Sequence, residues 1–140
     1  HVTATDFHPD TGTWLQHNAA LNGVALEYRQ LDWNAFLNQR SEVGDQRSEG
    51  TDRPPIADLR PPTSDFPLVI GSDLLYERCH LPALVCAIGA LCAPGGRAVI
   101  SDPGRANLDL FVSTMEKSGW RHTLHPEGDI YVCSFERAEP

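Results

Sequence analysis

The feature that most constrains the fold of this chain is a regular alternation of strand-like and helix-like segments along its 140 residues. The strand-like segments are β-branched, alternate apolar with polar residues, or form short apolar runs. They span Val2–Asp6, Val24–Leu31, Phe66–Gly71 and Arg97–Ser101. Strands that alternate with helices are connected by right-handed crossovers and pair in parallel, with helices on both faces of the sheet. The sequence therefore predicts an α/β domain with a mostly parallel sheet.

Three helices are expected between these strands, because apolar residues recur there at helical spacing. The first begins at a cap formed by Asp10 or Thr11. The three helices end at the turn-forming segments Asn22-Gly23, Pro94-Gly95-Gly96 and Ser118-Gly119. Phe66–Gly71 is a continuous apolar run, which is typical of a strand buried on both faces.

Two more strand-like segments close the chain, Trp120–His125 and Ile130–Phe135. Only four residues join them, which favours a hairpin, so we expect the hairpin to add one antiparallel strand to the sheet.

The composition changes between Asn38 and Asp65, a stretch of 28 residues with four prolines and six acidic residues. Such a segment cannot bury enough apolar surface to offset its ordering entropy. We therefore expect a disordered insertion there, with an ordered lid as the alternative.

Charge and cysteine content exclude several classes of protein. A net charge of −8 argues against binding nucleic acid through its phosphates. No apolar run is long enough to span a bilayer, so no membrane partner is expected. The four cysteines show no C-x-x-C spacing, which favours a reduced, cytoplasmic chain.

No metal site is expected, because the histidines lack ligand spacing with the cysteines. These histidines are His8, His17, His80, His122 and His125. Three cysteines on or beside one predicted helix are expected to be buried small hydrophobes. They are Cys79, Cys86 and Cys92.

Four predicted strands end in an acidic residue or in a turn that carries one. The four residues are Asp6, Asp32, Asp73 and Asp102. Each alone could be a helix cap, but ligands of open α/β sheets bind beyond the carboxyl ends of the strands. Asp6 suits the two hydroxyls of a ribose and Asp32 suits the amino group of adenine, while Trp33 or Phe7 could cover the base.

Three motifs carry a resemblance to a known family. They are VTATDFHP around Asp6, RQLDWNAF around Asp32-Trp33, and GSDLLYE with its D-x-x-Y. Together they resemble the class I, seven-β-strand methyltransferases that use S-adenosylmethionine, in particular the family 16 type that contains protein lysine methyltransferases. The C-terminal pattern APGGRAVISDPGR, followed by a helix and a hairpin, is also similar. The resemblance runs from the family's second strand to its last and implies a Rossmann-like fold.

The resemblance implies a role for each residue on the adenosine side of the cofactor. Asp6 would hold the ribose hydroxyls and Phe7 would border the adenine. Asp32 would bind the adenine amino group, and Trp33 would pack against the base or the cofactor. The alternative for Trp33 is plain core packing.

The resemblance also implies a catalytic pair. Asp73 would lie beside the methionine end of the cofactor, and Tyr76 would shape the methyl-transfer and substrate pocket. The alternative for Tyr76 is a residue that packs in the first turn of a helix against the sheet. The implied acceptor is a protein lysine or a small amine, whose nitrogen must lose its proton before it attacks.

One departure from the family pattern is the absence of its first strand and of the glycine-rich E/D-x-G-x-G turn. The adjacent glycines Gly95-Gly96 follow Pro94 and precede a later strand, so they predict a turn instead. In the family, the missing strand is central, between the strands that start at Val2 and Phe66. Residues 1–140 are therefore expected to be the C-terminal major part of one methyltransferase domain, inactive alone.

Two other functions remain open from the sequence. One is a non-catalytic, methyltransferase-like interaction domain that has lost its cofactor cradle. The other is a nicotinamide-dependent oxidoreductase, in which Asp6 would bind the ribose of the dinucleotide. Asp32-Trp33 and the closing hairpin favour the methyltransferase, because a dehydrogenase needs neither. No G-x-S-x-G or P-loop motif is present, which argues against a hydrolase.

Overall fold

The computed structural model describes residues 1–39 and 66–137, which fall into two compact units. The first unit comprises residues 1–33, and the second comprises residues 34–39 and 66–137. Of the predicted insertion at Asn38–Asp65, only the first two residues are described, at the end of a short helix. The rest of that prediction lies outside the described residues.

The first unit is a β-α-β motif, as the sequence predicts. Its two strands pair in parallel, with Asp6 opposite Gln30. The second strand is shorter than expected, because Val24 is exposed and its N–H donates to the carbonyl of Ala19 at the end of the helix. The elements are β1 (Thr3–Asp6), α1 (Thr11–Leu21) and β2 (Glu27–Gln30).

Helix α1 packs closely on β2 through Gly12. A Cβ atom at Gly12 would lie 2.5 Å from the ring of Tyr28, so only glycine fits there. Asp10 is the N-cap residue, but its side chain makes no capping hydrogen bond. Its carboxylate lies 3.9 Å from the ring of His8 instead.

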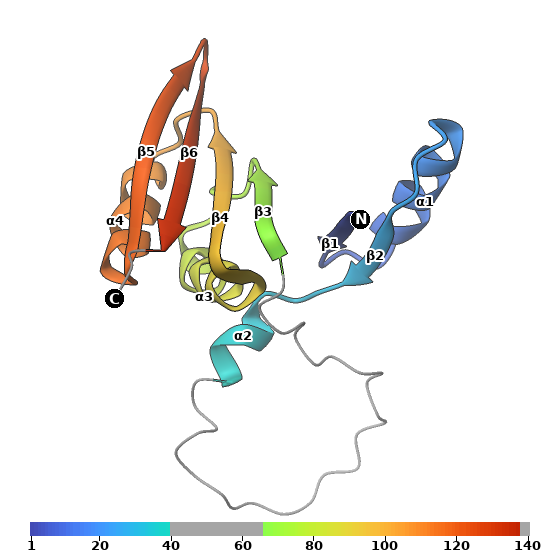
Figure 1. Ribbon diagram of the computed structural model, residues 1–140, viewed down its shortest axis with the longest axis horizontal. Coiled ribbons are helices and arrows are strands. Elements are labelled where there is room, and N and C mark those ends of the chain that lie inside the picture. Colours follow the sequence, from blue (N-terminus) through green and yellow to red (C-terminus); the bar gives the residue numbers. More distant parts are fainter. Residues whose placement is uncertain (40–65, 138–140) are drawn as a thin grey trace, which may run out of the picture. The chain divides into compact units, whose positions relative to one another are not determined.

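The second unit contains a four-stranded sheet with the order β3-β4-β6-β5 (Figure 1). Strands β3 and β4 are parallel, and β6 is antiparallel to both of its neighbours. The predicted hairpin is confirmed, with longer strands and a turn that begins at Gly128, whose φ is +62°. The strands are β3 (Phe66–Ser72), β4 (Cys92–Asp102), β5 (Trp120–Glu127) and β6 (Ile130–Arg137).

Helices α3 and α4 lie behind the sheet in Figure 1 and cover one of its faces. The rings of Phe111 in α4 and Phe135 in β6 meet edge to face at 5.5 Å in this core. Buried residues of β4, such as Ala98 and Ile100, point into the same layer. The helical segments of this unit are α2 (Asn34–Gln39), η1 (Arg78–His80), α3 (Leu81–Leu91) and α4 (Leu108–Lys117).

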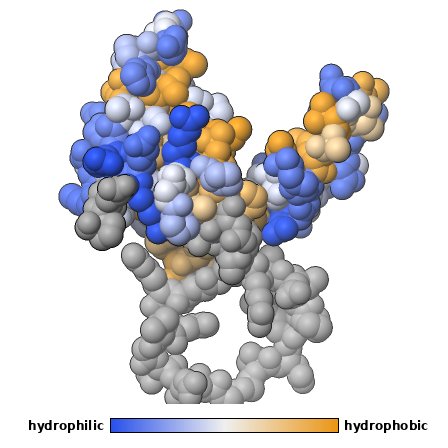
Figure 2. Space-filling model, viewed as in Figure 1, coloured by the Kyte–Doolittle hydropathy of each residue, from blue (hydrophilic) through white to orange (hydrophobic). Residues whose placement is uncertain are grey.

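Strand β3 is not buried on both faces, so this expectation is wrong. Leu68 and Ile70 are 44% and 72% exposed, and Figure 2 shows apolar surface over β3. The reason is topological: within residues 1–39 and 66–137, β3 is an edge strand whose one partner is β4. In the register, Ile70 is opposite Val99, which lies between the buried residues Ala98 and Ile100 of β4. Ile70 therefore lies on the face of the sheet that α3 and α4 do not cover.

All four cysteines are free thiols with different environments. Cys92 and Cys133 are buried, whereas Cys79 is exposed, which corrects the expectation for that residue. The reason is that Cys79 lies in η1, two residues before the buried face of α3 begins at Leu81. Burial raises the pKa of Cys133 to about 11, with a smaller contribution from the charge of Asp102.

Within residues 1–39 and 66–137, no helix has both the length and the apolar character needed to cross a membrane.

Candidate functional site

Asp6 and Asp32 follow the two parallel strands of the first unit at the same end of the sheet. This placement results from the register, in which Asp6 is opposite Gln30 and the backbone N–H of Leu31 donates to the carbonyl of Asp6 at 2.9 Å. Both carboxylates belong to half-buried residues. The first unit therefore brings two acids to one sheet edge, as the sequence predicts.

The loop after β1 is held in place by polar contacts from β2. The Oδ1 atom of Asp6 accepts the backbone N–H of His8 at 2.7 Å. The side-chain amide of Gln30 donates to the carbonyl of Phe7 at 3.0 Å, and the hydroxyl of Tyr28 lies 3.4 Å from the carbonyls of Asp6 and His8. Partial burial and then the charge of Asp6 raise the pKa of Tyr28. These contacts fix the Asp6 carboxylate relative to its loop.

Two aromatic rings flank these acids in the sequence. The ring of Phe7 is 67% exposed, so it does not contribute to the packed core. Trp33 is half-buried in the turn that precedes α2. An exposed ring beside a carboxylate offers a surface on which a flat base can stack.

The second unit brings Asp73 and Asp102 together at the carboxyl ends of the parallel strands β3 and β4. Ser72 is opposite Ser101 in the register, and their hydroxyls are hydrogen bonded at 2.9 Å. The guanidinium of Arg105 contacts Oδ1 of Asp73 and lies 3.0 Å from Oδ2 of Asp102. Hydrogen bonds to Asp73 and then to Asp102 raise the pKa of Arg105 further. We name these three residues the arginine clamp.

Asp102 is the buried anchor of the arginine clamp. Its side chain is 1% exposed, and Oδ1 accepts the backbone N–H of Arg105 at 2.7 Å. Gly104 allows this turn, because its φ is +81° and a Cβ atom would lie 2.8 Å from the ring of Tyr131. Asp102 is not a helix cap, because the N-cap residue of α4 is Asn107. Its carboxylate instead closes the turn to Arg105 and orients the guanidinium.

Asp73 has a backbone conformation that side chains rarely adopt. Its φ is +62°, which is the one positive value for a non-glycine residue in the described part of the chain. Its N–H donates to the carbonyl of Ser101 at 3.0 Å, and Arg105 holds its exposed carboxylate. Strained residues held by their surroundings concentrate at functional sites, so Asp73 is a strong candidate for a ligand contact.

Tyr76 lies on the same loop as Asp73 and is 56% exposed. Its ring meets that of His80 edge to face at 6.1 Å. The side-chain amide of Asn107 fixes the loop through a 2.8 Å hydrogen bond to the carbonyl of Leu75. The alternative interpretation of Tyr76, packing against the sheet in the first turn of a helix, is wrong because the residue precedes η1 and is exposed.

The predicted site residues thus form two groups, each described within its own unit. Asp6, Phe7, Asp32 and Trp33 belong to the first unit, and the pair Asp73 and Tyr76 belongs to the second. Sequence reasoning missed Arg105. Its signal was the D-P-G-R turn directly after a strand, which places a cation three residues from a strand-end acid.

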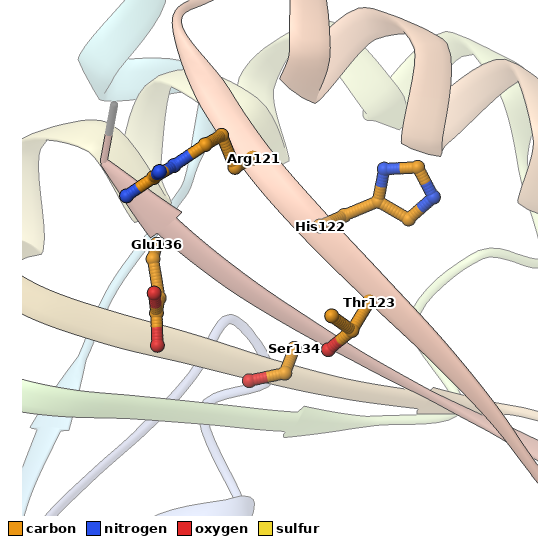
Figure 3. A pocket seen from close by; sticks show the side chains of 5 residues that line it. All are labelled: Arg121, His122, Thr123, Ser134 and Glu136. Atoms are coloured by element: carbon orange, nitrogen blue, oxygen red, sulfur yellow. The ribbon is translucent and has the colours of Figure 1, made fainter. Parts of the chain in front are cut away.

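A cavity of about 290 Å³ lies on the hairpin of β5 and β6, and none of the predicted site residues lines it (Figure 3). The side chains that line it do not converge on one point in Figure 3. His122 is directed elsewhere, because its ring lies 3.2 Å from the carboxylate of Glu116 in α4. The cavity is lined by Arg121, His122, Thr123, Ser134 and Glu136.

Comparisons with known proteins rest on structure alone, since no family model and no curated protein matches this sequence. The ribosomal protein L11 methylase of Lactobacillus delbrueckii subsp. bulgaricus is similar with a TM-score of 0.68 and 16% identity, over 99% of this chain and 58% of that one. A methyltransferase from Pyrococcus furiosus has a TM-score of 0.60 and 16% identity, over 99% of this chain and 63% of that one. A TehB-like SAM-dependent methyltransferase from Corynebacterium glutamicum has a TM-score of 0.59 and 19% identity, over 97% of this chain and 67% of that one.

The chain spans less than two thirds of the length of the first two of these structures. At such low identities the similarity concerns the fold. The predicted α/β, Rossmann-like fold class is therefore confirmed, and the similarity covers 97–99% of the chain. The sheet of the second unit differs from the predicted mostly parallel sheet with helices on both faces. Within the described residues, it has one parallel and two antiparallel pairings, and α3 and α4 cover one face.

Proposed function

We propose that this protein is an S-adenosylmethionine-dependent methyltransferase that acts on a protein lysine or a small amine. The observation that carries the proposal is the similarity of 99% of the chain to a methylase structure at a TM-score of 0.68. The acids at the strand ends support it, because they occupy the sheet edges at which α/β folds bind ligands. The lysine or small-amine acceptor rests on the sequence motifs alone.

The residues of the first unit fit the adenosine part of the cofactor. Asp6 is the last residue of β1, next to a loop that β2 holds in place, and a carboxylate can accept hydrogen bonds from the two hydroxyls of a ribose. Asp32 at the same sheet edge supplies an acceptor for an amino group, and the exposed Phe7 supplies a stacking surface. When bound, the cofactor would supply an activated methyl group on its sulfonium.

The residues of the second unit fit the alignment of an acceptor amine. Methyl transfer depends mainly on positioning the nucleophile, so a carboxylate held in one place is more useful than a mobile one. The arginine clamp and the left-handed backbone hold Asp73 in this way. Arg105 contacts Oδ1 of Asp73, so Oδ2 can accept a proton from the amine, and the hydroxyl of Tyr76 is available on the same loop.

A methyl-transfer assay tests the proposal with the product of the complete gene and labelled S-adenosylmethionine. Protein acceptors with free lysines are compared with the same proteins after chemical blocking of their amines, and small amines are added separately. Asp73→Asn and Tyr76→Phe should each lower kcat at least roughly tenfold, which corresponds to about 1.4 kcal/mol. Asp129→Asn, in the exposed hairpin turn, is the matched control and should leave kcat unchanged. Equal transfer to blocked and free acceptors would exclude an amine substrate.

A non-catalytic interaction domain is the second candidate. The same assay distinguishes the two functions, because a non-catalytic domain transfers no methyl group to any acceptor.

A further inference from the structure

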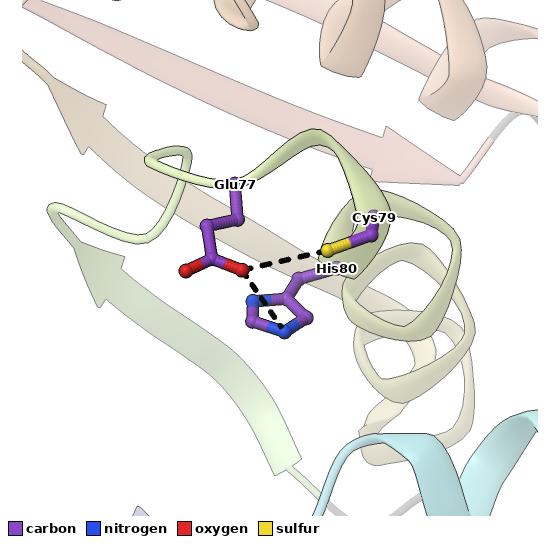
Figure 4. Close-up of side chains that lie close together, drawn as sticks. All are labelled: Glu77, Cys79 and His80. Carbon is purple, nitrogen blue, oxygen red and sulfur yellow. Dashed lines mark hydrogen bonds and ion pairs between the residues drawn. The ribbon is translucent and has the colours of Figure 1, made fainter.

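Three side chains with metal-binding atoms meet at the start of α3, on the loop after β3. Oε2 of Glu77 lies 3.5 Å from Sγ of Cys79 and 3.6 Å from Nε2 of His80 (Figure 4). All three ligand atoms lie within 4.8 Å of one another. We propose that Glu77, Cys79 and His80 bind a divalent transition-metal ion, with Zn²⁺ as the best fit. The proposal does not depend on methyltransferase activity.

The distances between these atoms fit tetrahedral coordination. Zinc binds thiolate sulfur at about 2.3 Å, and it binds imidazole nitrogen and carboxylate oxygen at about 2.0–2.2 Å. At the tetrahedral angle, such bonds place neighbouring ligand atoms about 3.3–3.6 Å apart. The two measured separations, 3.5 and 3.6 Å, already match this range. Small side-chain rotations therefore suffice to bind the ion.

The local backbone explains why these residues converge. Glu77 is extended, with φ of −122° and ψ of 125°, and its carbonyl accepts the N–H of His80 at 3.2 Å to close the turn of η1. Both ends of the segment are anchored in the core, by Leu75 on one side and Leu81 on the other. The cluster is thus held on a fixed turn, while Glu77 and Cys79 remain open to an ion from solvent.

The ligand set selects the class of metal. A thiolate with an imidazole favours zinc and related transition metals over magnesium and calcium, which prefer oxygen ligands alone. On binding, the thiol of Cys79 releases its proton to solvent. Three protein ligands leave one tetrahedral position for water, as in sites with an open coordination position. The ion would lie beside Tyr76, whose ring packs against His80.

This site was not predicted from the sequence, because the usual signal of a metal site is a spacing between histidines and cysteines that are distant in the sequence. The three ligands instead lie within the segment E-R-C-H, and one of them is a carboxylate.

Cobalt titration tests the site on the full 140-residue chain, reduced, stripped with a chelator and free of any affinity tag. Tetrahedral Co²⁺ with a thiolate ligand gives visible d–d bands and a thiolate-to-cobalt charge-transfer band. We expect both bands to saturate at one equivalent of Co²⁺ and to disappear when Zn²⁺ is added. Absence of the charge-transfer band in the wild type would overturn the proposal.

Matched variants assign the ligands. Cys79→Ser should abolish the charge-transfer band, and Glu77→Gln and His80→Asn should each weaken Co²⁺ binding at least roughly tenfold. Cys86→Ser is the thiol control, since Cys86 lies on α3 outside the cluster, and it should bind Co²⁺ like the wild type. Wild-type affinity in Cys79→Ser, or an equal loss in Cys86→Ser, would contradict the assignment.

A measurement on the unmodified chain guards against misfolded variants. Zn²⁺ should slow alkylation of Cys79 at least roughly tenfold and leave the rate at Cys86 unchanged, as read by peptide mass spectrometry. Equal rates at Cys79 with and without Zn²⁺ would overturn the proposal.

Discussion

Removal of the Asp102 carboxylate should destabilise the second unit more than any change at an exposed acid. Asp102 is 1% exposed and accepts two hydrogen bonds from Arg105, at 2.7 Å from the backbone N–H and 3.0 Å from the guanidinium. Hydrogen bonds to a charged group contribute about 1.5–3 kcal/mol each, and the guanidinium bond is discounted because Arg105 is one-third exposed. We therefore expect Asp102→Ala to lower the free energy of unfolding by about 3 kcal/mol.

Thermal melting of the 140-residue chain measures this loss. At this chain length, 1 kcal/mol corresponds to roughly 3–4 °C, so Tm should fall by about 10 °C in Asp102→Ala. Asp102→Asn keeps the shape and one acceptor and should lose about half as much. Asp129→Asn, in the exposed hairpin turn, is the control and should melt within about 2 °C of the wild type. A Tm for Asp102→Ala within that same margin would refute the anchoring role of Asp102.

Three further predictions concern the second unit. Because burial raises the pKa of Cys133 from 9.0 to about 11, its neutral thiol contributes stability that is complete below about pH 9 and is lost as pH rises through 11. The free energy of unfolding, measured in urea, should fall between pH 8 and pH 11 by roughly 2 kcal/mol less in Cys133→Ala than in the wild type. An equal fall in both proteins would contradict the effect of burial on this thiol. Gly104→Ala should cost at least about 1 kcal/mol, from its φ of +81° and from contact with Tyr131, and an unchanged urea midpoint would contradict this strain. Ile70→Ala should change stability by less than about 0.5 kcal/mol, whereas Ile100→Ala on the neighbouring strand should cost about 2–5 kcal/mol, and similar costs would show that Ile70 is buried in solution.

The order of elements could be predicted from the sequence because it depends on local patterns. The hairpin and the helix at Leu108–Lys117 follow from turn residues and from apolar spacing, and both are confirmed. The α/β fold class follows from the alternation of these elements. Burial of β3 could not be predicted in this way, because it depends on whether neighbours cover both faces of the strand. An apolar run has the same sequence at an edge as in the centre of a sheet.

The sequence predicted which acids lie at the ends of strands, but not the environment of each acid. Asp73 and Asp102 both follow parallel strands, but only the structure separates a buried anchor from an exposed carboxylate. The turn at Gly104 directs Arg105 back toward the sheet, where it contacts both Asp102 and Asp73. The exposure of Cys79 was likewise not predictable, since only two residues separate this exposed thiol from the buried face of α3.

The dependence of S-adenosylmethionine binding on Asp6 tests the central claim most directly. Calorimetric titration of the gene product should show that it binds S-adenosylmethionine. Asp6→Asn should weaken binding at least roughly tenfold, because a charge-assisted hydrogen bond to ribose contributes about 1.5–3 kcal/mol. Asp10→Asn, an exposed acid four residues away, is the matched control and should bind like the wild type. Unchanged affinity in Asp6→Asn, or tighter binding of NAD than of S-adenosylmethionine, would contradict the account.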